Sequence, residues 1–99
     1  MANEDEKRAL HRALVDRILN GEGRASPQQR ARAFRNEDDL SGKIAASPAQ
    51  VTEADLVAAK ASGLSEDQLF ELVICAAVGQ ATRQYEAGLA ALAAATDAP

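Results

Sequence analysis

The sequence predicts an all-α protein, a small helical domain of about five helices that ends in a long alanine-rich helix. Two observations favour this fold class. Alanine, the residue with the highest helix propensity, makes up 23 of the 99 residues, and apolar residues recur at the spacing of amphipathic helices. A chain of this length forms a single domain, residues 1–99, and its alanines predict closely approaching helices around a modest core.

The first predicted helix spans residues 4–19. Leu10, Leu14 and Ile18 follow one another at four-residue intervals, which places them along one side of a helix. Gly21 supplies the stop signal after this segment.

Two shorter helices follow. Ser26 and Pro27 are typical of an N-cap and of the first helical position, and they predict a helix to about Arg35 that buries Phe34. Residues 40–46 have room for one or two further helical turns.

Capping signals start the last two helices. Thr52 and Asp55 have the spacing of a capping box, and the helix that they start ends with Gly63 in the C′ position. Ser65 and Gln68 repeat the device two residues later. They predict the start of the last helix.

The last helix carries the strongest local signal in the chain. Residues 72–79 are apolar all the way round, which is typical of a helix in the centre of a core. Beyond them, Tyr85, Leu89 and Leu92 lie along one side of a helix that can run to about Ala94.

A helix of that extent is about 45 Å long, more than a globule of this size needs. We therefore expect its end to pack on another copy of the chain, or to bend near Gly79 or Gly88. Residues 95–99 are expected to form a frayed tail.

The charge of the chain argues against a nucleic-acid partner. The formal net charge is −4 and the isoelectric point is about 4.9, whereas binding to phosphates needs a basic face. The corner at Gly63 has the spacing of a helix–turn–helix, but Glu66, Asp67 and Glu71 would then face the phosphates. The longest acid-free basic cluster is interpreted as a solvated helix face rather than an anion site: Arg24, Arg30, Arg32 and Arg35.

Composition limits the other classes of site and compartment. The single cysteine, Cys75, excludes an internal disulfide and any multi-cysteine metal site, and we expect neither a metal nor a cofactor. The acidic N-terminus lacks the basic start and apolar run of a signal peptide, and no apolar stretch approaches the ~18 residues that a membrane span requires. We therefore expect a cytoplasmic protein without a membrane partner.

Residues 48–94 carry a pattern that extends over almost half of the chain. A short helix ends at a glycine, the acidic capped turn GLSEDQ follows, and a long alanine-rich helix comes next, in VTEADLVAAKASGLSEDQLFELVICAAVGQATRQYEAGLAAL. This pattern resembles the second half of the carboxymuconolactone decarboxylase and alkylhydroperoxidase D-like superfamily. The resemblance implies an all-helical fold that assembles into trimers or hexamers, so we expect a homo-oligomer.

The resemblance also implies where the chemistry would lie. The peroxidase branch carries Cys-x-x-Cys-x-x-x-His, with the His eight residues before the turn glycine, and Pro48, Val51 and Asp55 occupy those three positions here. The decarboxylase branch places a proton-handling His at the third position, again Asp55 in this chain. An Asp can act as an acid or a base, but its place in a capping box is the simpler explanation. The chain therefore departs from the superfamily's catalytic pattern.

Cys75 and His11 are candidates outside that pattern. Cys75 stands in the apolar run, where burial raises the pKa of a thiol and makes it inert, so structural packing is favoured over a reactive thiol. His11 lies at the edge of the apolar side of the first helix, and no further ligand accompanies it at metal-binding spacing. It is interpreted as a packed or interfacial residue.

Glu71, Arg83 and Tyr85 are the candidates on the last helix. A partly buried carboxylate needs a cationic partner, and Arg83 is the one basic residue of that helix, about 18 Å further along it. The two could meet only through an antiparallel neighbour or a second copy. The alternative is that Arg83 pairs locally with Glu86, three residues on.

The preferred prediction is a non-catalytic helical oligomerisation or interaction protein whose partner is a second copy of itself or another protein. The alternative is an enzyme or small-molecule binder, peroxidase-like or decarboxylase-like, with a site at the subunit interface. That site would draw on Glu71, Arg83, Tyr85, His11 and Cys75.

Overall fold

The structure, a computed structural model, describes residues 3–97. These residues are all-helical, as predicted, and contain no strand. The elements in chain order are α1 (Glu4–Asn20), α2 (Pro27–Phe34), α3 (Asp39–Ala46), a short 3-10 helix η1 (Pro48–Gln50), α4 (Glu53–Ala61) and α5 (Glu66–Asp97).

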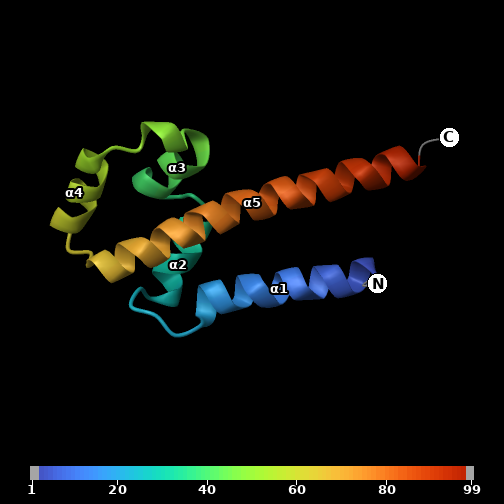
Figure 1. Cartoon of the computed structure of the whole chain (residues 1–99), viewed down its shortest axis with the longest axis horizontal. Coiled ribbons are helices and arrows are strands. Elements are labelled where there is room, and N and C mark those ends of the chain that lie inside the picture. Colours follow the sequence, from blue (N-terminus) through green and yellow to red (C-terminus); the bar gives the residue numbers. More distant parts are fainter. Residues whose placement is uncertain (1–2, 98–99) are drawn as a thin grey trace.

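Helix α5 is the axis on which the other helices are arranged (Figure 1). α1 lies antiparallel beside its middle, where His11 contacts Thr82 and the Ile18 carbonyl oxygen contacts Cys75. α2 crosses its N-terminal half, and α3 and α4 lie on the side away from α1. We call α1 together with α5 the arm. The molecule measures 55 × 29 × 21 Å, so it is elongated along α5.

The predicted capping residues form capping hydrogen bonds, and Ser26 does so in a capping box with Gln29 that was not predicted. The Ser26 hydroxyl accepts from the Gln29 N–H at 3.0 Å, and the Gln29 amide oxygen accepts from the Ser26 N–H at 2.9 Å. Thr52 and Asp55 form the second capping box. Gly63 follows α4 with φ +110°, a conformation that favours glycine, and so turns the chain into α5.

Helix α5 is one continuous helix, and it corrects two predictions. It runs to Asp97 rather than to about Ala94, so the frayed tail expected from residue 95 is wrong for residues 95–97, while 98–99 lie outside the described residues. Gly79 does not bend the helix. A side chain there would overlap the carbonyl oxygen of Phe34, so this glycine lets the end of α2 approach α5 closely.

The core is thin and built mainly from small residues. Its buried apolar members among the described residues are Ala25, Ala33, Leu69, Cys75 and Ala76. The prediction that residues 72–79 lie in the centre of the core is correct only in part, because the neighbouring helices cover one side of α5 and leave Ile74 37% exposed.

The interpretation of the basic cluster as a solvated face is wrong for Arg30, which is buried. Its guanidinium donates to the carbonyls of Ala25 at 3.1 Å, Gly21 at 2.8 Å and Ile18 at 3.3 Å. Arg30 therefore caps the C-terminal end of α1, where carbonyls lack helical partners and favour a cation. Arg24, Arg32 and Arg35 are exposed as expected.

None of the helices in the part of the chain that the structure describes is long and apolar enough to cross a membrane.

Candidate functional site

His11 and Tyr85 are the two candidate side chains that the fold brings together. His11 comes from α1 and Tyr85 from α5, and their ring centroids lie 4.7 Å apart with the planes tilted by 35°. The His11 Nε2 lies 3.1 Å from the hydroxyl of Thr82, which is buried. This cluster joins the two helices of the arm, in agreement with the interpretation of His11 as a packed residue.

Glu71 anchors the loop that joins α1 to α2. Its carboxylate accepts from the Arg24 N–H at 2.7 Å and from the Ala25 N–H at 2.6 Å. The N–H of Ala25, and next that of Arg24, lowers the pKa of Glu71. Because backbone donors meet the carboxylate's need for partners, the reason for expecting a contact with Arg83 disappears.

Arg83 caps the end of α2. Its guanidinium donates to the Phe34 carbonyl oxygen at 2.9 Å and to the side-chain oxygen of Asn36, a residue with φ +57°. These bonds replace the predicted local pair with Glu86, which is not formed among the described residues. The carbonyls at the end of a helix carry partial negative charge and favour a cation, whereas an exposed ion pair contributes little to stability.

Cys75 is 1% exposed, and its Sγ lies 3.9 Å from the Ile18 carbonyl oxygen. Burial raises the pKa of this thiol. The thiol form is the weaker nucleophile, so the structure agrees with a packing role for Cys75.

Asp55 is held in two interactions at the start of α4. Its Oδ2 accepts from the Thr52 N–H at 2.8 Å and lies 2.9 Å from Nζ of Lys43. The hydrogen bond from Lys43, followed by the one from the Thr52 backbone, lowers the pKa of Asp55. A carboxylate of lowered pKa stays ionised near neutral pH and is a weak base there, so Asp55 is suited to capping rather than to proton transfer.

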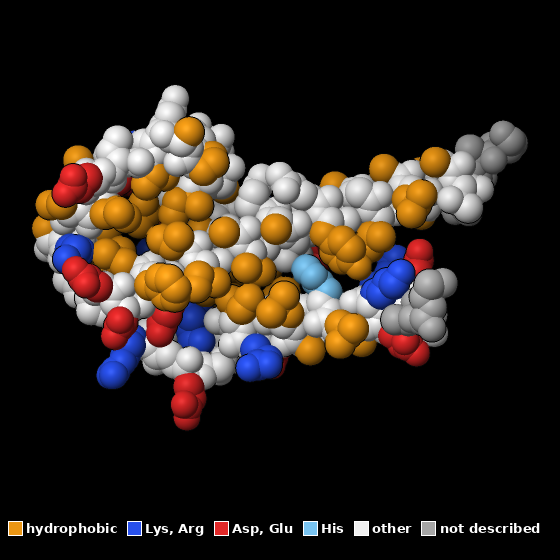
Figure 2. Space-filling model, in the orientation of Figure 1, with side chains coloured by type: hydrophobic (Ala, Val, Ile, Leu, Met, Phe, Trp, Pro, Cys, Tyr) orange, Lys and Arg blue, Asp and Glu red, His pale blue; other side chains and the backbone are white. Residues whose placement is uncertain are grey.

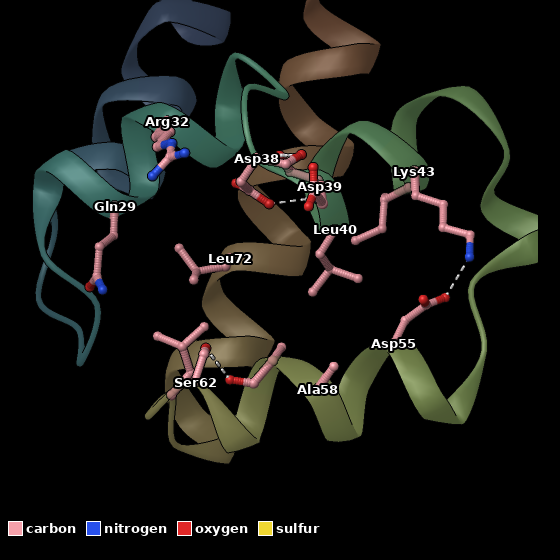
Figure 3. A pocket seen from close by; sticks show the side chains of 14 residues that line it. Gln29, Arg32, Asp38, Asp39, Leu40, Lys43, Asp55, Ala58, Ser62 and Leu72 are labelled. Carbon is pink, nitrogen blue, oxygen red and sulfur yellow. Dashed lines mark hydrogen bonds and ion pairs between the residues drawn. The ribbon is translucent and has the colours of Figure 1, made fainter.

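A hollow of about 680 Å³ separates α4 from α2 and α3 (Figure 3). Leu40 and Leu72 point into it from α3 and α5, and the Lys43–Asp55 pair closes one end. The exposed Arg32 lies at its rim. The hollow depends on how far α4 stands from α3, a distance that no local sequence signal reports.

Large apolar side chains gather on one face of the arm and along α5 (Figure 2). Five of them are exposed, and we call these the apolar face: Leu10 (68%), Leu14 (52%), Phe70 (68%), Ile74 (37%) and Leu92 (58%). The sequence predicted the stripe on α1 but not that the fold would leave its first two residues, Leu10 and Leu14, exposed.

Thr82, Arg30 and Ser41 are buried polar residues whose structural roles sequence reasoning missed. Thr82 carried a usable signal, since it lies three residues before Tyr85 and is therefore its neighbour one turn away on the helix. Arg30 carried none, because its burial follows from the path of the loop before it.

Among residues 3–97, no three His, Cys, Asp or Glu side chains come together in a way that could hold a metal ion. Comparison with family models, with curated proteins and with solved structures finds no match for this chain. The geometry described above is therefore the basis on which a function is proposed.

Proposed function

We propose that this chain is a non-catalytic helical oligomerisation or interaction protein that works through the apolar face of α1 and α5. The observation that carries the proposal is the exposure of Leu10, Phe70 and Leu92, each more than half exposed on neighbouring helices. Exposed apolar surface that extends along neighbouring helices marks sites of association in soluble proteins.

The use made of the candidate catalytic residues supports a non-catalytic role. Glu71 holds a loop, Asp55 caps α4, Cys75 is buried, and His11 stacks on Tyr85. Catalysis needs such groups within hydrogen-bond reach of one reacting atom. Here each group is engaged at a different place along the fold.

We also propose that the second half of the chain is related to the carboxymuconolactone decarboxylase and alkylhydroperoxidase D-like superfamily. The capped α4, the turn at Gly63 and the long α5 that follows it support this relation. At the position of the superfamily's histidine, Asp55 is bonded to Thr52 and Lys43. A member of this type would keep the helical corner without its chemistry.

Light scattering and thiol titration test the proposal. We expect a particle heavier than the 10.4 kDa chain, a Cys75 thiol that reacts only on unfolding, and no peroxide turnover. A protein that is monomeric at every concentration and captures no partner would contradict the association role. A fast-reacting thiol, with peroxide turnover that Cys75→Ser abolishes, would contradict the non-catalytic role.

The hollow between α3 and α4 favours a second candidate function, the binding of a small molecule. Its volume of about 680 Å³ is in the range of ligand pockets, which combine an apolar floor with a few polar groups. NMR titration with a library of small amphipathic acids and amines tests this candidate. Shifts confined to residues around Leu40 and Leu72 would support it, and no shifts at millimolar ligand would remove it.

A further inference from the structure

The exposed side of α5 carries an uninterrupted uncharged stripe. It consists of Phe70, Ile74, Ala77, Ala81, Tyr85, Gly88 and Leu92, of which Tyr85 is half-buried and the others are exposed. The steps between them are four, three, four, four, three and four residues, so the spacing is the same in both directions from Ala81. At equal distances from Ala81, a large residue on one side matches a small one on the other: Ile74 matches Gly88, and Tyr85 matches Ala77.

Helix α1 repeats this symmetry at the same level of the arm. His11 contacts Thr82, and the Ile18 carbonyl oxygen contacts Cys75. Because the helices are antiparallel, these two contacts set Arg12 level with Ala81. Leu10 and Leu14 lie two residues on either side of Arg12.

The two leucines and the stripe face the same side of the arm. Leu10 precedes the inward-facing His11 by one residue, as Ala81 precedes the inward-facing Thr82. In two antiparallel helices that lie side by side, the residue immediately before each contact residue points to the same face of the pair. Figure 2 shows hydrophobic side chains along both helices on one face.

The accessible surface leaves room for a large interface. The chain exposes 6905 Å², whereas a compact monomer of its mass exposes only about 5,400 Å². The difference of about 1,500 Å² exceeds the roughly 800 Å² that each partner buries in a stable complex of standard size. The radius of gyration is likewise 15.9 Å against about 13 Å for a compact chain of 100 residues.

Resting on the proposed function, we infer that the occupant of this face is a second copy of the chain, bound about a two-fold axis that passes between the arms at Ala81. The axis sets the two α5 helices antiparallel and stacks α1 on the partner's α1. An interface of this kind must be complementary to itself. The apolar residues of α5 and those of α1 are both spaced symmetrically about the level of Ala81, so the face is complementary to itself. Binding to a different protein would not require this symmetry.

Near its centre the axis pairs a large side chain with a small one, which lets helices pack closely: Ile74 meets the partner's Gly88, and Tyr85 meets the partner's Ala77, on either side of the two Ala81 residues. Farther out it pairs large apolar side chains with each other, Phe70 with the partner's Leu92 and, on α1, Leu10 with the partner's Leu14.

A charge at the axis tests the inferred interface. Ala81→Glu should raise the dimer dissociation constant at least about 30-fold, the effect of losing a central contact residue, as measured by analytical ultracentrifugation. Ala87→Glu is the matched control: Ala87 is also exposed on α5 but is turned about 120° away, and it should leave the constant unchanged. Circular dichroism verifies that both variants remain helical.

Cysteine cross-linking tests the register independently, in a Cys75→Ser background whose hydroxyl can bond to the Ile18 carbonyl. We expect Ile74→Cys and Gly88→Cys chains to form a disulfide only when mixed, since each position lies about 21 Å from its own copy in the antiparallel pair. A cysteine at Gly88 fits, because no atom lies within 4 Å of the position that its Cβ would take. Cross-linking of either chain with itself would indicate parallel helices.

The outcomes separate this inference from the proposed function. Loss of the dimer in Ala81→Glu, together with cross-linking of the mixture alone, supports the two-fold arrangement. An oligomer that survives Ala81→Glu, or that cross-links in another register, overturns the arrangement and leaves association through another surface intact. A wild-type protein that is monomeric at all concentrations overturns the two-fold dimer. The proposed function then stands if the monomer captures a protein partner, and fails if it captures none.

Discussion

At the scale of single residues, polar side chains connect segments that the small core cannot hold together. Glu71 ties the loop between α1 and α2 to α5, and Arg30 ties the same loop to the end of α1. Charge-assisted hydrogen bonds to backbone groups are stronger than neutral ones. In a protein whose buried apolar residues are mostly alanine, such bonds contribute a larger share of the specificity of packing.

Changing Glu71 to Gln should lower the free energy of unfolding at pH 7 by about 1–2 kcal/mol, because charge-assisted hydrogen bonds are lost. The folded-state pKa of Glu71 is lowered from its ordinary value of 4.5, so its contribution is present above that value and is lost as the pH falls through the folded-state pKa. Urea unfolding should show the difference at pH 7 and a smaller one at pH 3. Glu86→Gln is the control, and an equal loss at both pH values would contradict the prediction.

At the scale of elements, local signals start and end the helices, and packing decides how each helix is used. The capping residues of α2 and α4 act within one turn of the chain, so their sequence spacing was sufficient. Gly79 and Gly88 have equal helix propensity, yet only Gly79 meets another helix. The sequence therefore predicted two possible bend points, whereas in the structure Gly79 contacts the end of α2 and Gly88 faces open space.

The two glycines of α5 should respond to alanine in opposite directions. Gly79→Ala must displace the end of α2 and should cost about 1–3 kcal/mol, as overpacking does. Gly88→Ala removes a poor helix former in open space and should gain up to about 1 kcal/mol. Both are measured by chemical unfolding in the Ala81→Glu background, so that association does not contribute. A stabilising Gly79→Ala would show that α2 does not approach α5 as described.

At the scale of the whole molecule, the elongated arm exposes what a compact bundle would bury. α1 contacts α5 along one side only, through His11 and the Ile18 carbonyl oxygen, and Leu10 and Leu14 remain exposed. Because association would bury this exposed surface, we expect the stability of the folded chain to depend on protein concentration.

The melting temperature of the wild type should rise by roughly 3 °C for each tenfold increase in protein concentration, because association stabilises the folded state. Ala81→Glu should show no such rise.

Lys7 and Arg17 each lie three residues from a leucine of the apolar face, and the two-fold axis brings Lys7 near the partner's Arg17. Added salt screens this repulsion and should tighten the dimer. Calorimetry at two salt concentrations measures the dimer dissociation constant. A constant that rises with salt would contradict an apolar interface.

The sequence by itself determined the helical class, the caps at Ser26 and Thr52, the turn at Gly63 and the burial of Cys75, because propensity, capping and apolar runs act over a few residues. Only the tertiary structure decided that Arg30 is buried, that Glu71 binds a loop, that Arg83 caps α2 and that α5 exposes its stripe. Those outcomes depend on which surfaces meet across tens of residues of chain. A pattern within one helix specifies its apolar side, but the number and path of its neighbours decide how much of that side is covered.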